Sequence, residues 1–392
     1  MRKKIAIVVQ RYGLEVNGGA ELLARLLTER IHAYYDVEVI TSCALDYTTW
    51  DNHYHAGLSE VSGIKVRRFT VDIQRDMERF NEVNTRLLTT ERGNEKTEQE
   101  WIDEQGPFCT ELIEYIKDNK DKYDIFVFVT YLYYPTARGL YPVREKAILI
   151  PNAHDEPYIR FKFFNSIFNS PRAIAFNTEE EKCFVQNIFS NSNIPSEIVG
   201  VGIDIPEAPN PEAFKEKYGL NDYILYAGRI DHGKNSPELF NYFINYKKRN
   251  PSDLKLVLMG KEIIEISEHP DIIPLGFVSD EDRINGMAGA KLFVLPSIFE
   301  SLSMAVLESM ALGVPIVING KCEVVKGHCL KSNAGLYYEN YYEFEGCINY
   351  LLENDDVYIA MSKNAREYVE NNYRWDVVIT KFRNLIEKIL CR

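Results

Sequence analysis

Two glutamates separated by seven residues stand out among the side chains that could do chemistry. Glu300 and Glu308 follow an apolar run and precede the segment 311–315. Ser301 and Ser303 are both competent amino-terminal caps, so a helix beginning near either one would leave Glu300 in a loop and place Glu308 in the second turn. Carboxylates set apart in this way can each accept hydrogen bonds from a diol, one on a sugar and one on a ribose. A helix with one solvated glutamate has the same spacing and stays open as an alternative.

A basic pair follows another apolar run. Residues 223–227 lead into Gly228, and Arg229 and Lys234 come directly after it. A guanidinium is a planar fork of donors and an ammonium is a compact charge, so two such cations at the carboxyl end of a strand suit a diphosphate. A solvated surface pair is the competing interpretation.

A glycine turn precedes the first expected helix. Gly18 and Gly19 lie between the apolar run 5–9 and the helical period 21–33. A strand, a glycine turn and a helix amino terminus together form an anion site, because free backbone amides face the ligand. The sequence has neither the P-loop nor the Gly-x-Gly-x-x-Gly pattern, so a tight turn remains the alternative.

Histidines and cysteines offer fewer signals. His154 and Asp155 follow the strand expected at 147–151, where a histidine serves either an active site or a structural hydrogen bond. The spacing of Cys322, His328 and Cys329 fits no zinc pattern. Seven cysteines without a Cys-x-x-Cys pair are typical of reduced thiols in a cytosolic protein.

The elements that must position these residues alternate between strands and helices, which predicts doubly wound parallel sheets of the α/β class. We expect a first domain at 1–205 with a charged helical insertion at about 72–122, and a second domain at 206–374. The proline-rich link 206–211 would act as a hinge beside a central cleft. An amphipathic helix at 375–392 would pack back on the first domain. The strands are expected at 5–9, 37–41, 64–69, 124–130, 147–151, 173–177 and 197–201 in the first half, and at 223–227, 254–259, 272–276, 291–295 and 315–318 in the second.

Composition excludes several classes of protein. The 392 residues include 45 Lys and Arg against 58 Asp and Glu, a net charge of −13, so binding to nucleic acid is not expected. The longest apolar run, 125–134, is too short to span a bilayer, and the amino-terminal run is too short for a signal peptide. We therefore expect a cytoplasmic protein with at most peripheral contact at the inner face of a membrane.

Together these residues resemble the retaining glycosyltransferases of family 4, which have the GT-B fold of two facing Rossmann-like domains. The Glu-x7-Glu spacing of Glu300 and Glu308 is the most specific element of the resemblance. In that family the first glutamate contacts the donor sugar, the second contacts the ribose, and the basic pair holds the diphosphate. The resemblance also implies donor contacts from the glycine turn, from the turn that meets the base, and from the start of the helix after Glu300. Those residues are Gly18, Gly19, Phe277, Val278, Ser301, Leu302, Ser303 and Met304.

Two departures from the family pattern concern the pocket. Many members carry glycine where this chain has Ser301 and Ser303. The serine side chains would narrow the sugar pocket, so the identity of the transferred sugar is not predicted. The strand expected at 124–130 runs into Tyr131 where members often have a histidine, and His154 with Asp155 resembles a histidine–aspartate segment seen in a subset of the family. The resemblance therefore implies catalytic roles for His154, Asp155 and Glu300, with the acceptor site formed either by His154 or by a residue near Tyr131.

The expected activity is transfer of a sugar, with retention, from a UDP- or GDP-linked donor to a glycan, a lipid-linked glycan or another hydroxyl acceptor in polysaccharide biosynthesis. The resemblance implies no protein nucleophile, no metal and no cofactor beyond this co-substrate. Sugar phosphorylases and nucleotide-sugar epimerases share the fold and remain alternatives. A non-catalytic glycosyltransferase-like subunit is the remaining, non-enzymatic alternative.

Overall fold

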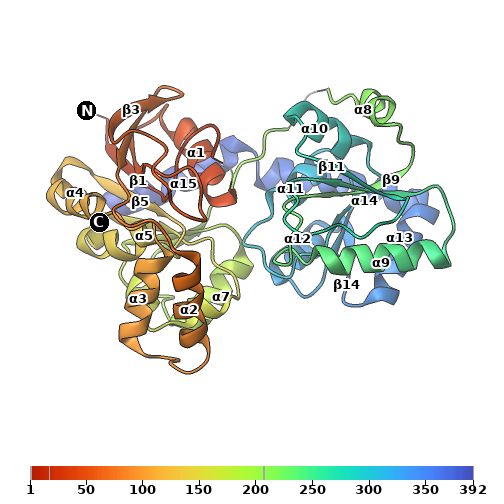
Figure 1. Cartoon of the computed structure of the whole chain (residues 1–392). Coiled ribbons are helices and arrows are strands. Elements are labelled where there is room, and N and C mark those ends of the chain that lie inside the picture. The colour runs from red at the N-terminus through yellow and green to blue at the C-terminus, as the bar shows by residue number, and fades with distance from the viewer. Residues whose placement is uncertain (1, 17, 206–207, 392) are drawn as a thin grey trace. The chain divides into compact units, whose positions relative to one another are not determined.

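The structure is a computed structural model that describes residues 2–16, 18–205 and 208–391. Its backbone separates into two compact units (Figure 1). Unit 1 comprises Met1–Val201 together with Val378–Arg392, and unit 2 comprises Gly202–Val377. Parts of the expected glycine turn, hinge and terminal helix fall outside the described residues, namely Asn17, Pro206, Glu207 and Arg392.

Unit 1 is built on an eight-stranded sheet with the order β3-β4-β2-β1-β5-β6-β7-β8. Among these strands only β3 runs antiparallel to its neighbour, β4. The central strand β5 reads Ile-Phe-Val-Phe-Val and is buried along its whole length, as expected of a parallel strand covered on both faces. The strands are β1 (Lys4–Val8), β2 (Asp36–Ser42), β3 (Gly57–Val61), β4 (Ile64–Phe69), β5 (Ile125–Val129), β6 (Ala147–Ile150), β7 (Ala173–Phe176) and β8 (Ser196–Ile198).

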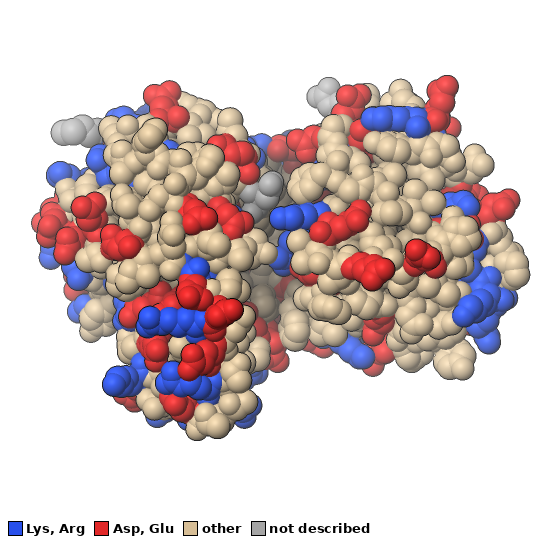
Figure 2. Space-filling model, in the orientation of Figure 1, with Lys and Arg blue, Asp and Glu red and all other residues tan. Residues whose placement is uncertain are grey.

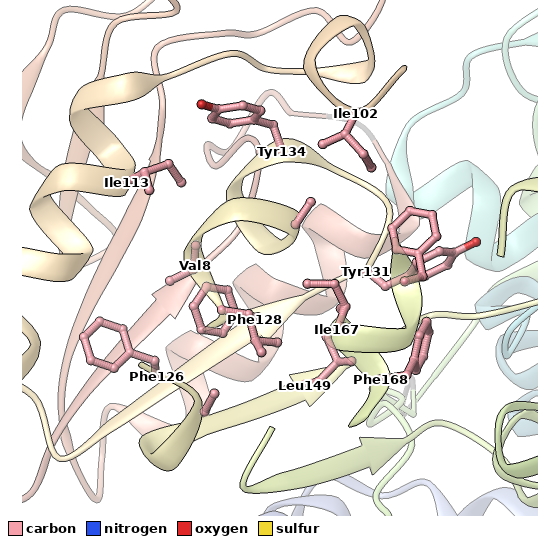
Figure 3. Close-up of a cluster of buried hydrophobic side chains, with 14 of the residues drawn as sticks. Val8, Ile102, Ile113, Phe126, Phe128, Tyr131, Tyr134, Leu149, Ile167 and Phe168 are labelled. Atoms are coloured by element: carbon pink, nitrogen blue, oxygen red, sulfur yellow. The ribbon is translucent and has the colours of Figure 1, made fainter. Parts of the chain in front are cut away.

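The core of unit 1 lies where aromatic side chains of the sheet meet the helices. Phe128 of β5 and Leu149 of β6 are paired in register, and the rings of Tyr131 and Phe168 lie 5.2 Å apart beside them (Figure 3). Ile102 of the insertion belongs to the same cluster. The helices of this unit are α1 (Gly19–Ile31), α2 (Met77–Leu88), α3 (Glu95–Gln105), α4 (Thr110–Asp118), α5 (Tyr134–Gly139), α6 (Phe164–Asn169), α7 (Glu179–Phe189) and, from Val378 onward, α15 (Trp375–Leu390).

Residues 72–122 contain α2, α3 and α4, and the outer faces of α2 and α3 carry interleaved charges. Arg79 contacts Glu104 at 2.6 Å, and Arg86 contacts Glu91 at 3.1 Å. Figure 2 shows acidic and basic side chains mixed over these two helices. The inner face is apolar and buries Trp101 completely. The insertion is therefore part of the unit 1 core.

Unit 2 has a six-stranded parallel sheet with the order β11-β10-β9-β12-β13-β14. The order reverses between β9 and β12, and in such sheets ligands bind outside the carboxyl ends of the strands at this switch point. The strands are β9 (Tyr223–Ala227), β10 (Lys255–Met259), β11 (Ile272–Gly276), β12 (Leu292–Leu295), β13 (Ile316–Asn319) and β14 (Gly335–Tyr338). The helices are α8 (Pro211–Tyr218), α9 (Ser236–Arg249), α10 (Asp280–Gly289), α11 (Met304–Ala311), α12 (Glu323–Ser332), α13 (Tyr341–Glu353) and α14 (Asp355–Asn372).

The predicted α/β class with two Rossmann-like units is confirmed, and three strand predictions are corrected. Strand β3 was not predicted, because it is an edge strand with four of its five residues exposed and so has no apolar alternation. Strand β14, a four-residue edge strand, was not predicted either. The strand expected at 197–201 is instead β8, which ends at Ile198 because the backbone turns through Gly200 at a φ of +73°.

Candidate functional site

The turn after β9 carries the basic pair. Arg229 and Lys234 lie between the end of β9 and the start of α9, at the switch point of the unit 2 sheet. The turn packs closely against the neighbouring strand end, since a Cβ on Gly260 would lie 1.9 Å from the carbonyl oxygen of Gly228. Glycine at position 260, with a φ of +138°, is what permits this approach.

Asp231 orders the turn that carries the two cations. Its Oδ1 accepts a hydrogen bond from the backbone N–H of Lys234 at 2.7 Å, and its Oδ2 lies 3.5 Å from Nε of Arg229. The Asp231 side chain is mostly buried, whereas that of Arg229 is half exposed. A buried carboxylate thus fixes the turn while the guanidinium remains accessible to a ligand.

The central contact of the site joins two predicted residues. Nζ of Lys234 donates to Oε1 of Glu300 at 2.7 Å, across 66 positions of sequence. The Lys234 side chain is about a quarter exposed and that of Glu300 is 11% exposed. The pair places a strong cationic donor beside an acceptor of hydroxyl hydrogen bonds, which suits a ligand with an anionic group next to a polyol.

A polar network beneath this pair fixes the ends of three elements. The side-chain amides of Asn235, at the start of α9, and of Asn319, at the end of β13, both donate to Glu238 and to the carbonyl of Pro296. Pro296 follows β12 directly. The strand ends and the helix start at the switch point are therefore held together by side-chain hydrogen bonds.

The start of helix α11, after the loop that follows β12, differs from the predicted helix cap. Helix α11 begins at Met304, and Ser303 occupies the cap position at a φ of +66° without a side-chain cap hydrogen bond. The expectation that Ser301 or Ser303 caps the helix through its hydroxyl is therefore wrong, because capping geometry requires an extended backbone at that residue. The left-handed backbone at position 303 also gives a physical reason for the glycine that many members of the resembling family carry there. Leu302 is buried beside it.

Glu308 lies in the second turn of α11 and contacts a residue that the sequence analysis missed. Nη1 of Arg283, on α10, donates to Oε2 of Glu308. Burial raises the pKa of the Glu308 carboxyl, and Arg283 opposes that shift. The pairing joins positions 25 residues apart on two different helices, so the spacing of residues in the sequence gives no signal for it.

The turn after β11 presents an exposed ring. Gly276 ends the strand at a φ of +64°, and the side chain of Phe277 that follows is 72% exposed, with Val278 half-buried beyond it. An exposed phenyl ring on the turn that leads into α10 offers a flat apolar face within the same unit as Arg283 and Glu308.

The glycine turn of unit 1 packs on a buried ion pair. Nε of Arg11, after β1, donates to Oε1 of Glu21 on α1 at 2.9 Å, and both side chains are 6% exposed. A Cβ on Gly18 would lie 2.2 Å from the other carboxylate oxygen of Glu21, whereas one on Gly19 would meet nothing within 4 Å. Glycine at position 18 therefore lets the turn close over the ion pair, which sequence reasoning missed.

His154 lies after β6, and its ring faces the carboxylate of Glu156 instead of that of the adjacent Asp155. Its Nε2 is 4.0 Å from Oε1 of Glu156, and the same oxygen accepts a hydrogen bond from the hydroxyl of Tyr131 at 2.5 Å. Asp155 is exposed and pairs with Arg160 at 2.5 Å. Glu156 thus brings together His154 and Tyr131, the two residues considered for the acceptor site.

A fully buried carboxyl holds the loop that carries His154. Glu181 of α7 accepts hydrogen bonds from the backbone N–H groups of Ala153 and Asn177, both at 2.6 Å. Burial raises the pKa of Glu181 to about 8, although these backbone donors oppose the shift. The loop after β6 is therefore tied to the end of β7 by one side chain.

The predicted site residues gather into two groups, one in each unit. Unit 2 brings together Lys234 and Glu300, with Arg229 joined to them through Asp231, and it pairs Glu308 with Arg283. The unit 1 group comprises the glycine turn, and Tyr131 with His154 around Glu156.

The described residues contain neither a metal-binding cluster nor a membrane-spanning helix. No cluster of three or more histidine, cysteine, aspartate or glutamate side chains there is arranged to hold a metal ion. Nor does the described part of the chain contain a helix that is both long and apolar enough to cross a membrane.

The comparison with protein families identifies the domain of unit 2. Residues 207–368 match the family model of the glycosyl transferases group 1. These residues include Arg229, Lys234, Glu300 and Glu308. The chain therefore contains a group 1 glycosyltransferase domain, which confirms the resemblance at the level of this broad group.

Similar curated proteins match parts of the chain. One is the N-acetylgalactosamine-N,N'-diacetylbacillosaminyl-diphospho-undecaprenol 4-alpha-N-acetylgalactosaminyltransferase of Campylobacter jejuni, 31% identical over 34% of this chain and 37% of that protein. Another is the O-antigen chain mannosyltransferase B of Escherichia coli, 29% identical over 29% of this chain and 33% of that protein. The chain thus matches only about a third of the length of these two relatives.

Similar solved structures cover the whole chain. Sucrose-phosphate synthase from Thermosynechococcus elongatus superposes with a TM-score of 0.72 at 14% identity, covering 100% of both chains. Anabaena HepE in complex with UDP and glucose superposes with a TM-score of 0.68 at 14% identity, also over 100% of both chains. At this identity the likeness concerns the fold, and the chain has the GT-B fold.

Proposed function

We propose that the chain is a retaining glycosyltransferase that moves a sugar from a UDP- or GDP-linked donor to a hydroxyl of a glycan or lipid-linked glycan. The observation that carries the proposal is the 2.7 Å contact between Lys234 and Glu300 at the switch point of the unit 2 sheet. In this proposal Lys234 binds the diphosphate and Glu300 binds hydroxyls of the donor sugar.

The group 1 domain match and the nucleotide complexes of similar structures support a nucleotide-sugar donor. HepE of Anabaena is solved with UDP-glucose as well as with UDP and glucose. In this chain the exposed ring of Phe277, with Val278, would lie against the base and Glu308 would accept from the ribose hydroxyls. Arg283 then orients the Glu308 carboxyl and opposes the rise in its pKa that burial causes.

Catalysis would come from stabilising the departing diphosphate. Negative charge develops on that group as the bond to the anomeric carbon breaks. Preorganised donors aimed at such charge contribute about 10²–10³-fold each. Lys234, Arg229 and the free amides at the start of α11, from Ser303 and Met304, are the donors in this account.

Retention follows in this account from attack on the face that the nucleotide leaves. The acceptor oxygen bonds to the anomeric carbon, the carbon–oxygen bond to the diphosphate breaks, and the hydroxyl proton passes to the departing diphosphate. No protein nucleophile is required, and the two cations of the β9 turn take the charge that a metal ion would otherwise offset. We therefore propose a reaction that needs no metal ion.

The acceptor side is assigned to unit 1. His154, with Glu156 and Tyr131 behind it, would position the acceptor hydroxyl, and the turn at Gly18 and Gly19 would approach the donor phosphate or the reacting sugar. Asp155 would act beside His154 only if it released Arg160.

The relatives support the class of acceptor. The Campylobacter jejuni protein is named for an undecaprenol-diphosphate-linked substrate and the Escherichia coli protein for O-antigen chains. A polysaccharide or lipid-linked glycan acceptor is accordingly proposed, with the protein in the cytoplasm and in peripheral contact with the inner face of the membrane.

The test is a transfer assay with radiolabelled UDP- and GDP-sugars and a mixture of glycan and lipid-linked acceptors, run with and without a chelator. The account predicts a product that retains the anomeric configuration of the donor, at a rate that the chelator leaves unchanged. Phosphate-dependent release of sugar phosphate would instead identify a phosphorylase. Conversion of the donor without acceptor would identify an epimerase. An inverted product would overturn the mechanism.

A further inference from the structure

His328 stands apart from the residues assigned so far. It lies on α12, and its side chain is 1% exposed. Its Nε2 is 2.9 Å from the carbonyl oxygen of Leu302, so this nitrogen carries the proton and donates. Its Nδ1 lies 3.0 Å from the hydroxyl of Tyr368 on α14. Both ring nitrogens are thus engaged in hydrogen bonds with protein groups.

The carbonyl that His328 holds belongs to the loop between β12 and α11. Leu302 lies two residues after Glu300 and immediately before Ser303. Ser303 has a φ of +66°, a conformation that is strained for a residue with a Cβ and persists only where surrounding contacts hold it. Its hydroxyl makes no cap hydrogen bond. The hydrogen bond from His328 acts on the peptide unit that joins Leu302 to Ser303.

We propose that His328 is a positioning residue for the donor sugar. Its Nε2–H fixes the Leu302 carbonyl, and this keeps the amides of Ser303 and Met304 aimed at the donor and Glu300 beside Lys234. The proposal rests on the proposed function, because it assigns a role within the same donor site. It also accounts for a buried histidine that neither a zinc site with Cys322 and Cys329 nor the Glu-x7-Glu motif explains.

Substitution of His328 by glutamine or by asparagine distinguishes the contribution of Nε2 from that of Nδ1. Glutamine places its amide nitrogen near the position of Nε2, so His328→Gln can still donate to the Leu302 carbonyl. Asparagine is one carbon shorter and reaches only about as far as Nδ1, so His328→Asn loses the contact with Leu302. Tyr246→Phe is the matched control, since it removes a buried hydroxyl that donates to Asn349 at 2.8 Å in the same unit.

The kinetic test compares the sugar nucleotide with the free nucleotide. His328→Asn is expected to lower kcat/KM for the sugar nucleotide about tenfold, below the roughly hundredfold that a 1 Å misplacement costs. Its affinity for UDP or GDP alone should fall less than this, because the free nucleotide keeps Lys234, Arg229 and Glu308 and has no sugar for Glu300 to bind. His328→Gln and Tyr246→Phe should keep wild-type kinetics. Equal kinetics in His328→Asn and His328→Gln would overturn the proposal.

A second readout does not depend on activity. Hydrogen–deuterium exchange of the amides at 301–304 should be faster in His328→Asn than in His328→Gln. Unchanged exchange there would also overturn the proposal. If the wild-type protein turns over no sugar nucleotide while this exchange difference is present, the proposed function fails and the positioning of the loop stands.

If His328→Asn does not fold, Ser303→Gly supplies the comparison. Glycine accepts a φ of +66° without strain, so His328→Asn with Ser303→Gly should fold. Its amides at 301–304 should still exchange faster than those of Ser303→Gly alone, because the hydrogen bond to the Leu302 carbonyl is missing. Equal exchange at 301–304 in the double variant and in Ser303→Gly alone would contradict the role of the hydrogen bond.

Discussion

Lys234 can contact either of two anions, the Glu300 carboxylate that it now touches and the diphosphate that it is proposed to bind. Replacing it with alanine should lower the transfer rate about 10²-fold, the effect of removing one preorganised donor. Arg229→Ala should have a smaller effect of about tenfold, because that side chain is half exposed and its charge is better screened.

The measurement is kcat for transfer in both variants, with Lys215→Ala as the control. Lys215 pairs with Glu212 on the surface of α8, away from the switch point. Near-normal rates in both site variants would remove the diphosphate assignment.

Glu308→Gln should weaken binding of the nucleotide. The glutamine amide has the shape of the glutamate carboxylate but not the charge that strengthens hydrogen bonds from ribose hydroxyls. We expect a loss of about 1.4 kcal/mol in binding free energy, or tenfold in Kd. Calorimetry with the nucleotide and with its 2',3'-dideoxy analogue measures the effect. The analogue should bind the wild-type protein and the variant equally. Equal loss for both ligands would show that Glu308 acts on the fold and not on the ribose.

Sequence reasoning located the side chains of the site better than their partners. The helix start expected near Ser301 or Ser303 correctly placed Glu300 in a loop and Glu308 in the second helical turn. Sequence reasoning could not reveal Arg283 or Glu156, because those contacts arise only when separate elements pack together. The predicted cap at Ser303 was wrong for a local reason. Ser303 has a positive φ, and a positive φ can be predicted from residue type only where the residue is glycine.

At the scale of elements, the loop after β6 depends on a buried acid. Burial raises the pKa of Glu181 to about 8, so the folded state holds a proton that the unfolded chain releases near its ordinary pKa. The resulting stability is fully present below the ordinary pKa and is lost as pH rises through about 8.

The stability of the wild-type protein relative to Glu181→Gln should therefore fall between pH 5 and pH 8.5. Glutamine does not titrate and still accepts one of the two backbone hydrogen bonds, so it serves as the reference. Tm of both proteins across this range measures the difference. A difference that does not vary with pH would contradict the raised pKa.

The central strands were predictable and the edges were not. Strands such as β5 and β9 are continuous apolar runs, because helices cover both faces of a parallel sheet. The edge strand β3 has no buried face, and β8 ends where Gly200 turns the backbone. The predicted bounds of the other strands differ from the structure by one or two residues at most, because strand ends depend on hydrogen bonds that residue type does not encode.

At the scale of the molecule, unit 1 is completed by the end of the chain. Six apolar side chains of α15 are buried, and Lys388 of this helix contacts Glu197 at 3.2 Å. At about 1.5–3 kcal/mol for each buried side chain, the helix contributes an amount comparable with the roughly 5–15 kcal/mol of a folded domain.

A chain that ends at residue 374 should therefore lose the folded state of unit 1. Circular dichroism and limited proteolysis of this truncated chain measure the loss, with removal of Cys391 and Arg392 alone as the control. Rapid digestion within 1–201 is expected, and protection equal to that of the full chain would contradict the role of α15.

The claim on which the whole account depends is that the chain binds a nucleoside diphosphate sugar. The most direct measurement is a thermal-shift panel of UDP, GDP, ADP and their common sugar conjugates, applied to the wild-type protein and Lys234→Ala, because a ligand that binds only the folded state raises Tm. The account predicts that the UDP or the GDP series raises Tm of the wild-type protein, and that Lys234→Ala loses most of that rise. A panel with no shift for the wild-type protein, or an equal shift in both proteins, would contradict it.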